Sequence, residues 1–182
     1  MSASISAGDL CLETDRSAVH DASVPDGRLA GETRRVKVLL VASGGGHWVQ
    51  LMRIASAFSE HERVYVTTLR GCEGDVGGAR LHLVNDASRW NRIGLVKLAA
   101  RLMLLLLRER PDVVVSTGAA PGYFAVRFGK LLGARTVWLD SIANGEQLSL
   151  CGERVGPYAD LWLTQWQHLS RLDGPQYCGA VL

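Results

Sequence analysis

The chain has 182 residues, of which 47% are hydrophobic and 21% are charged, a balance that suits one globular domain with a sizeable core. The formal net charge of +2, without runs of lysine and arginine among aromatic residues, argues against a nucleic-acid-binding protein. The four cysteines lack C-x-x-C spacing, so we predict no metal site. The opening residues lack the basic and apolar regions of a secretory signal, so we expect a cytoplasmic protein.

Residues 1–34 are rich in Ser, Ala, Gly and Asp and lack periodic apolar residues, which predicts a disordered tail ahead of one domain, residues 35–182. From Val36 onward, short apolar runs alternate with helical patterns, as in an α/β fold with a parallel sheet. The expected strands are residues 36–41, 64–68, 81–84, 113–115, 136–139 and 161–164, with a seventh near 180–182. The expected helices are residues 48–58, 90–108 and 122–132.

A glycine-rich turn, Ser43-Gly44-Gly45-Gly46-His47, joins the first strand to the first helix. Backbone N–H groups at such a helix start favour a phosphate, and a histidine there can exchange protons near neutral pH. The turn matches neither the dinucleotide fingerprint nor the P-loop, which has a lysine after its glycines. The alternatives are a tight turn that serves only the fold and a histidine that serves only as a cap or a core-edge residue.

Two further strand ends carry polar residues that we expect at the same carboxyl edge of the sheet, where open α/β folds bind ligands. Ser116, Thr117 and Gly118 follow one strand, and their hydroxyls can hydrogen-bond a sugar or phosphate or cap the next helix. Asp140 and Ser141 follow another strand, and Asp140 is either an acid/base candidate or a solvated or capping carboxylate. Because there is no G-x-S-x-G motif, we do not expect Ser116 to be a hydrolase nucleophile.

The helix expected at residues 90–108 has more apolar surface than a sheet-covering helix needs. At 100° per residue, one narrow stripe of this helix contains Trp90, Lys97, Arg101 and Arg108. Its apolar run, residues 95–107, is shorter than the roughly 20 residues that span a bilayer. The pattern fits a helix on an anionic membrane surface or against a partner chain, or a buried helix whose cations extend to solvent.

Several short motifs follow one another along the chain. They are Ser43-Gly44-Gly45-Gly46-His47 with Gln50-Leu51, Ser116-Thr117-Gly118-Ala119 with Pro121-Gly122, Asp140-Ser141, Leu148-Ser149-Leu150, and the segments 159–166 and 177–182. In this order they resemble the acceptor-binding subunits of two-subunit UDP-sugar glycosyltransferases. That family includes the membrane-anchoring subunit of the N-acetylglucosamine transferase of asparagine-linked glycosylation and its bacterial exopolysaccharide counterparts.

The resemblance implies a Rossmann-like parallel sheet, the single N-terminal-type lobe of a GT-B glycosyltransferase. It implies a polyprenyl-pyrophosphate-linked acceptor, no cofactor or metal, and a heterodimer with a donor-binding subunit that holds most of the UDP-sugar. In this family pattern His47 faces the acceptor's pyrophosphate and hydroxyl as the catalytic residue, and residues 43–46, 116–118 and 140–141 bind the acceptor and its phosphates.

The sequence departs from the family pattern at two points. Asp140 stands where many bacterial relatives have glutamate, and Asn144 or Gly145 where they have arginine, so the acceptor's identity is not carried over. The tail has no transmembrane segment like that of eukaryotic subunits, so membrane contact is assigned to the helix at residues 90–108. The resulting hypothesis is a peripheral glycosyltransferase subunit on the cytoplasmic membrane face; the alternative is a non-catalytic membrane scaffold that recruits an enzyme.

Overall fold

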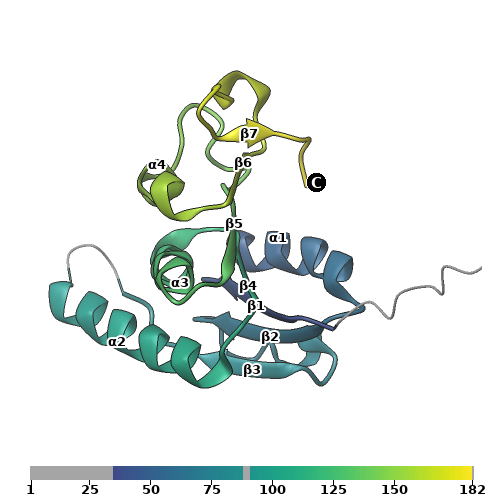
Figure 1. The fold of residues 1–182 in the computed structure, drawn as a ribbon, viewed down its shortest axis with the longest axis vertical. Coiled ribbons are helices and arrows are strands. Elements are labelled where there is room, and N and C mark those ends of the chain that lie inside the picture. The colour runs from purple at the N-terminus through teal and green to yellow at the C-terminus, as the bar shows by residue number, and fades with distance from the viewer. Residues whose placement is uncertain (1–34, 88–90, 182) are drawn as a thin grey trace, which may run out of the picture. The chain divides into compact units, whose positions relative to one another are not determined.

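The computed structural model describes residues 35–87 and 91–181, which form a seven-stranded sheet of order β3-β2-β1-β4-β5-β6-β7 (Figure 1). Every neighbouring pair of strands is parallel, so the α/β parallel sheet predicted from the sequence is confirmed. The strands are β1 (Lys37–Ala42), β2 (Glu62–Thr67), β3 (Arg80–Leu83), β4 (Val113–Ser116), β5 (Arg135–Leu139), β6 (Leu161–Thr164) and β7 (Gln176–Tyr177). The α-helices are α1 (Gly46–Ala55), α2 (Arg92–Glu109), α3 (Ala119–Leu131) and α4 (Leu150–Val155).

The structure corrects two of the predicted elements and adds one that the sequence did not indicate. The seventh strand is wrong at residues 180–182, because β6 instead pairs with Gln176 and Tyr177. The short helix α4 was not expected, since its six residues are too few for helical periodicity. The third helix begins at Ala119 rather than at residue 122. The tail expected for residues 1–34 lies outside the described residues.

Both faces of the sheet are covered by helices, because alternate residues of each strand point to opposite faces. Along β1, Val38 and Leu40 pack with the α1 face, which includes Trp48 and Leu51. On the other face, Leu39 and Val41 of β1 pack against α2 and α3. This cluster includes Leu98, Leu102, Leu105, Leu106, Ala125 and Val126. The helices thereby fix the strand ends from which the loops of the carboxyl edge emerge.

At the amino edge of the sheet, the buried carboxylate of Glu109 fixes the end of α2. Glu109 is 4% exposed and lies 3.0 Å from Arg80, 3.0 Å from His82 and 3.6 Å from Lys37. Burial alone would raise the pKa of Glu109, but the hydrogen bond with His82 and the charges of Arg80, His82 and Lys37 hold it below its ordinary value. The ionised form of Glu109 therefore stabilises the docked helix.

Candidate functional site

The glycine turn lies at the carboxyl end of β1 and leaves the start of α1 without a side-chain cap. Gly45 precedes the helix with a φ of 64°, a left-handed conformation that glycine adopts without steric cost. The N–H of Gly44 is held by Thr68 Oγ1 at 3.1 Å, which attaches the turn to the residue after β2. Because no side chain caps α1, its first N–H groups and helix dipole can receive an anion, and the phosphate site expected at this turn stays a prediction.

His47 lies in the first turn of α1 and is oriented by the end of β4. Its ring Nδ1 is 2.8 Å from the carbonyl oxygen of Thr117, while Thr117 Oγ1 donates to the His47 carbonyl at 2.7 Å. Because a carbonyl can only accept, the neutral ring carries its proton on Nδ1. The lone pair then lies on Nε2, the nitrogen available to accept a proton from a substrate hydroxyl.

Gly118 allows the His47 ring to lie against the backbone between β4 and α3. A Cβ atom at Gly118 would fall 2.6 Å from both Cε1 and Nδ1 of His47. Gly118 also has a φ of 132° and a ψ of −172°, a region open essentially to glycine alone. The glycine predicted as a ligand contact is therefore also the residue that makes room for the histidine.

The hydroxyls of Ser116 and Thr117 face the protein rather than an open site. Both residues are fully buried, and Ser116 Oγ accepts a hydrogen bond from the Gly118 N–H at 3.1 Å. Thr117 Oγ1 is occupied by the His47 carbonyl. Direct contact with a sugar or phosphate, as expected from the sequence, does not fit this burial; the geometry instead gives both hydroxyls a role in positioning Gly118 and His47.

Asp140 is the centre of the loop that follows β5. It is 2% exposed, and its carboxylate accepts hydrogen bonds from Trp138 Nε1 at 3.3 Å and Asn144 Nδ2 at 3.2 Å. It also accepts from Ser149, through N at 2.9 Å and Oγ at 2.7 Å. Since four donors occupy its oxygens, Asp140 acts in this structure as a loop organiser rather than as an exposed acid or base.

A buried network of amides connects α1 to this loop, and the sequence interpretation did not assign it. Gln50 donates to Ser141 Oγ at 3.2 Å, and its Oε1 accepts from Gln165 Nε2 at 2.8 Å. Gln165 also donates to the Asp140 carbonyl at 2.9 Å and accepts from the Val181 N–H at 2.8 Å. Ser141 is buried within this network, so its hydroxyl connects the loop to the helix that carries His47. The only sequence signal was the presence of both glutamines in the family motifs.

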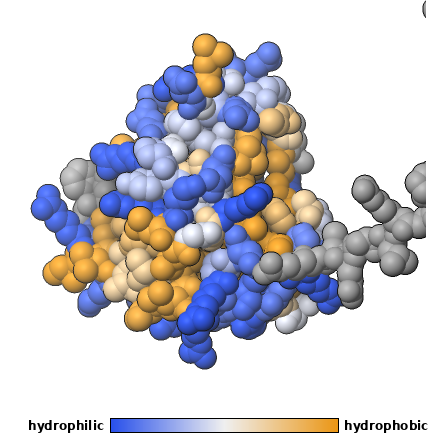
Figure 2. Space-filling model, in the orientation of Figure 1, coloured by the Kyte–Doolittle hydropathy of each residue, from blue (hydrophilic) through white to orange (hydrophobic). Residues whose placement is uncertain are grey.

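The helix α2 presents a mixed apolar and basic surface. Lys97, Arg101 and Arg108 are exposed, as predicted, whereas Trp90 lies outside the described residues. Beside these cations, four apolar side chains are between 49% and 71% exposed, namely Ile93, Val96, Leu104 and Leu107. Figure 2 shows apolar residues gathered on the surface over this helix. Within residues 35–87 and 91–181, no helix has the length and apolar composition needed to cross a membrane.

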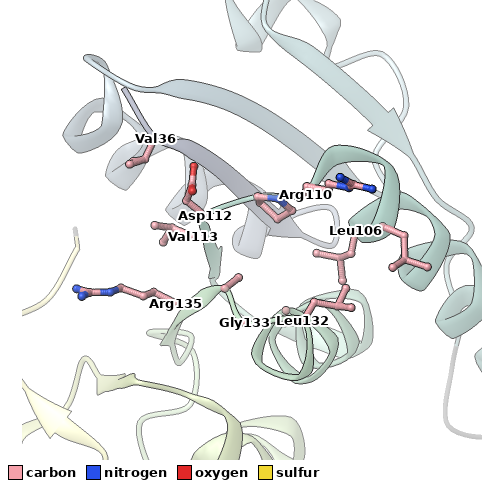
Figure 3. Close-up of a pocket in the computed structure, with 12 residues that line it drawn as sticks. Val36, Leu106, Arg110, Asp112, Val113, Leu132, Gly133 and Arg135 are labelled. Atoms are coloured by element: carbon pink, nitrogen blue, oxygen red, sulfur yellow. The ribbon is translucent and has the colours of Figure 1, made fainter. Parts of the chain in front are cut away.

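A cavity of about 870 Å³ lies at the amino edge of the sheet, opposite the site that contains His47 (Figure 3). Leu106, Leu132 and Gly133 line it, together with Val113 and Arg135 at the starts of β4 and β5. Because open α/β folds bind their ligands at the carboxyl ends of the strands, the site containing His47 is the better functional candidate. Among the described residues, no three His, Cys, Asp or Glu side chains converge to hold a metal ion.

No protein-family model matches the chain. The UDP-N-acetylglucosamine transferase subunit ALG14 of Yarrowia lipolytica is 24% identical over 167 residues, which cover 74% of this chain and 75% of that protein. The resemblance predicted from the motifs is confirmed.

Solved structures agree on the fold. MurG of Acinetobacter baumannii matches with a TM-score of 0.64 and 12% identity, over 80% of this chain and 45% of that one. A UDP-N-acetylglucosamine 2-epimerase from Rickettsia bellii matches with a TM-score of 0.56 and 14% identity, over 74% of this chain and 40% of the epimerase. The Rossmann-like lobe of GT-B type is therefore confirmed, and the chain spans less than half the length of these two structures.

Proposed function

We propose that this chain is the acceptor-side subunit of a UDP-sugar glycosyltransferase that extends a polyprenyl-pyrophosphate-linked saccharide. The observation that carries the proposal is the orientation of His47, whose Nδ1 is bound to the Thr117 carbonyl beside an uncapped helix start. The similarity to ALG14, a UDP-N-acetylglucosamine transferase subunit, supports the assignment to a subunit of a UDP-sugar transferase. The pathway is either lipid-linked oligosaccharide or exopolysaccharide synthesis.

In the proposed reaction, the acceptor's pyrophosphate binds the N–H groups at the start of α1. The acceptor hydroxyl then lies near His47 Nε2, which removes its proton as the oxygen attacks the anomeric carbon of the sugar. The bond between that carbon and the UDP oxygen breaks, and UDP leaves with the electron pair. His47 is thus the catalytic residue of this lobe, while Thr117 and Gly118 position its ring.

The donor site belongs, in this proposal, to a second chain. The similarity to ALG14, which is named as a transferase subunit, supports this division between chains. We therefore expect little transfer by the isolated subunit and full transfer by the heterodimer. The exposed cations and apolar residues of α2 support peripheral attachment to an anionic membrane, on the cytoplasmic face where the acceptor's saccharide would be extended.

The test is the reconstituted pair, prepared with the donor-binding chain that co-purifies with this one and assayed with a panel of UDP-sugars. His47→Ala is expected to lower kcat by about 10²-fold or more while subunit association is retained. His61→Ala is the matched control, because His61 directly precedes β2 at the opposite edge of the sheet. Full activity of His47→Ala in an intact complex would contradict the catalytic role and favour the scaffold. Full transfer by the isolated chain would contradict the subunit assignment.

A further inference from the structure

A second, apolar groove lies at the carboxyl edge of the sheet, on the face covered by α2, α3 and α4. Its volume is about 410 Å³, and it lies between the first turns of α2, α3 and α4. Its lining is mainly apolar and includes Leu95, Ala120, Tyr123, Phe124 and Leu150. The lining also contains one cation, Arg154. A volume in this range accommodates a small-molecule ligand or part of a larger one.

The walls of the groove are attached to the residues that organise the site. Ala120 follows Gly118 by two residues on the chain, and Gly118 lies against the His47 ring. On the other wall, Leu150 begins α4 directly after Ser149, which donates two hydrogen bonds to Asp140. A ligand that has its charged group at the start of α1 could therefore continue into the groove without leaving this edge of the sheet.

The chemistry of the groove favours an extended hydrocarbon with an anionic end. Tyr123 and Phe124 supply aromatic surface, and Leu150 is 45% exposed at the lip. Arg154 is exposed and lines the groove, where its guanidinium can contact a phosphate. On α2, Ile93 and Val96 flank Leu95 and extend the apolar surface outward from the groove.

We propose that this groove binds the isoprenoid units nearest the diphosphate of the acceptor, with Arg154 contacting the phosphate end. The inference rests on the proposed function, since it names where the lipid part of that acceptor lies. In this arrangement, part of the acceptor's binding affinity comes from contacts between its isoprenoid units and the groove, and part comes from insertion of the remaining units into the membrane. Affinity should therefore rise with prenyl length until the groove is filled, even without a bilayer.

The experiment measures direct binding to the full chain by calorimetry, with geranyl, farnesyl and geranylgeranyl diphosphate as probes. We expect affinity to rise about tenfold or more from the ten-carbon to the twenty-carbon probe, and inorganic pyrophosphate to bind most weakly. Ala120→Leu, which fills the groove, should remove most of the gain with length. Ala57→Leu adds the same side chain at an exposed position on the α1 side of the sheet and should leave binding unchanged.

Leu150→Gln provides a second variant at an exposed lip position and should also reduce the gain with length. Arg154→Gln should weaken all three diphosphates while leaving the length dependence in place. Equal affinity for the three probes, or wild-type binding by both Ala120→Leu and Leu150→Gln, would overturn the groove assignment. If the reconstituted pair transfers sugar without any length dependence, the groove is wrong and the transferase stands. If binding depends on length and on Ala120 but no pair transfers sugar, the groove stands and the proposed function fails.

Discussion

Replacing Gly118 by alanine tests the geometry on which the candidate site depends. The new Cβ would lie 2.6 Å from two atoms of the His47 ring, closer than real side-chain contacts allow. The ring would have to move, and its hydrogen bond to the Thr117 carbonyl would be lost or lengthened. We therefore predict that Gly118→Ala destabilises the fold locally and also misplaces the proposed catalytic nitrogen.

The magnitude follows from two separate terms. The backbone at Gly118, with φ 132° and ψ −172°, costs a non-glycine residue roughly 1–3 kcal/mol. Loss of the His47 hydrogen bond adds about 0.5–1.5 kcal/mol. We expect a total of about 3 kcal/mol, which lowers the melting temperature of a chain of this size by roughly 6–12 °C.

The chain offers a matched control and an internal check. Gly133 also has a positive φ, 87°, but a Cβ there would have no neighbour within 4 Å, so Gly133→Ala isolates the backbone cost. A double-mutant cycle measured by urea unfolding then combines Gly118→Ala with His47→Ala, which removes the ring. In the His47→Ala background, Gly118→Ala should cost only its backbone term, and therefore less than it costs in the wild type. A cycle with additive free energies, or equal costs for Gly118→Ala and Gly133→Ala in the wild type, would refute the close approach of the ring.

Three further predictions address other parts of the chain. Asp140→Asn replaces an acceptor of four hydrogen bonds with a group that also donates, so the free energy of unfolding in urea should fall by roughly 2–3 kcal/mol; an unchanged midpoint would contradict the loop-organising role. Burial alone would raise the pKa of Glu109, but the hydrogen bond and the neighbouring cations outweigh burial and hold this pKa below its ordinary value. The stability advantage of wild type over Glu109→Gln should therefore be complete at neutral pH. That advantage should shrink as pH falls through the ordinary glutamate value of about 4.3 toward the lower folded-state pKa, and a pH-independent difference would show that the ion pairs do not act. Replacing Lys97, Arg101 and Arg108 by glutamine should remove about 3 kcal/mol of affinity for phosphatidylglycerol vesicles in flotation, with high salt reproducing the loss, and equal flotation of both proteins would exclude the membrane role.

The parallel fold could be predicted because its signals are local. The apolar run that ends at Ala42 and the glycines after it define a strand, a turn and a helix start without tertiary information. The roles of Ser116 and Asp140 could not be predicted in the same way, since a hydroxyl or carboxylate at a strand end looks the same whether its partner is a ligand or the protein. The seventh strand was misplaced because a two-residue strand such as Gln176–Tyr177 has no periodicity, and its position is set by pairing with β6.

Several polar side chains at the carboxyl edge form hydrogen bonds within the protein, which restricts the chemistry that this lobe can supply. The hydroxyls of Ser116 and Thr117 and the carboxylate of Asp140 are occupied by the protein, whereas His47 Nε2 and the first N–H groups of α1 remain available. These groups can hold an anion and accept one proton, which is sufficient for the acceptor half of a glycosyl transfer. The charge that develops on the departing UDP requires separate donors positioned around the diphosphate. In the proposed enzyme those donors come from the donor-binding chain, so removing the partner should abolish transfer even when His47 is intact.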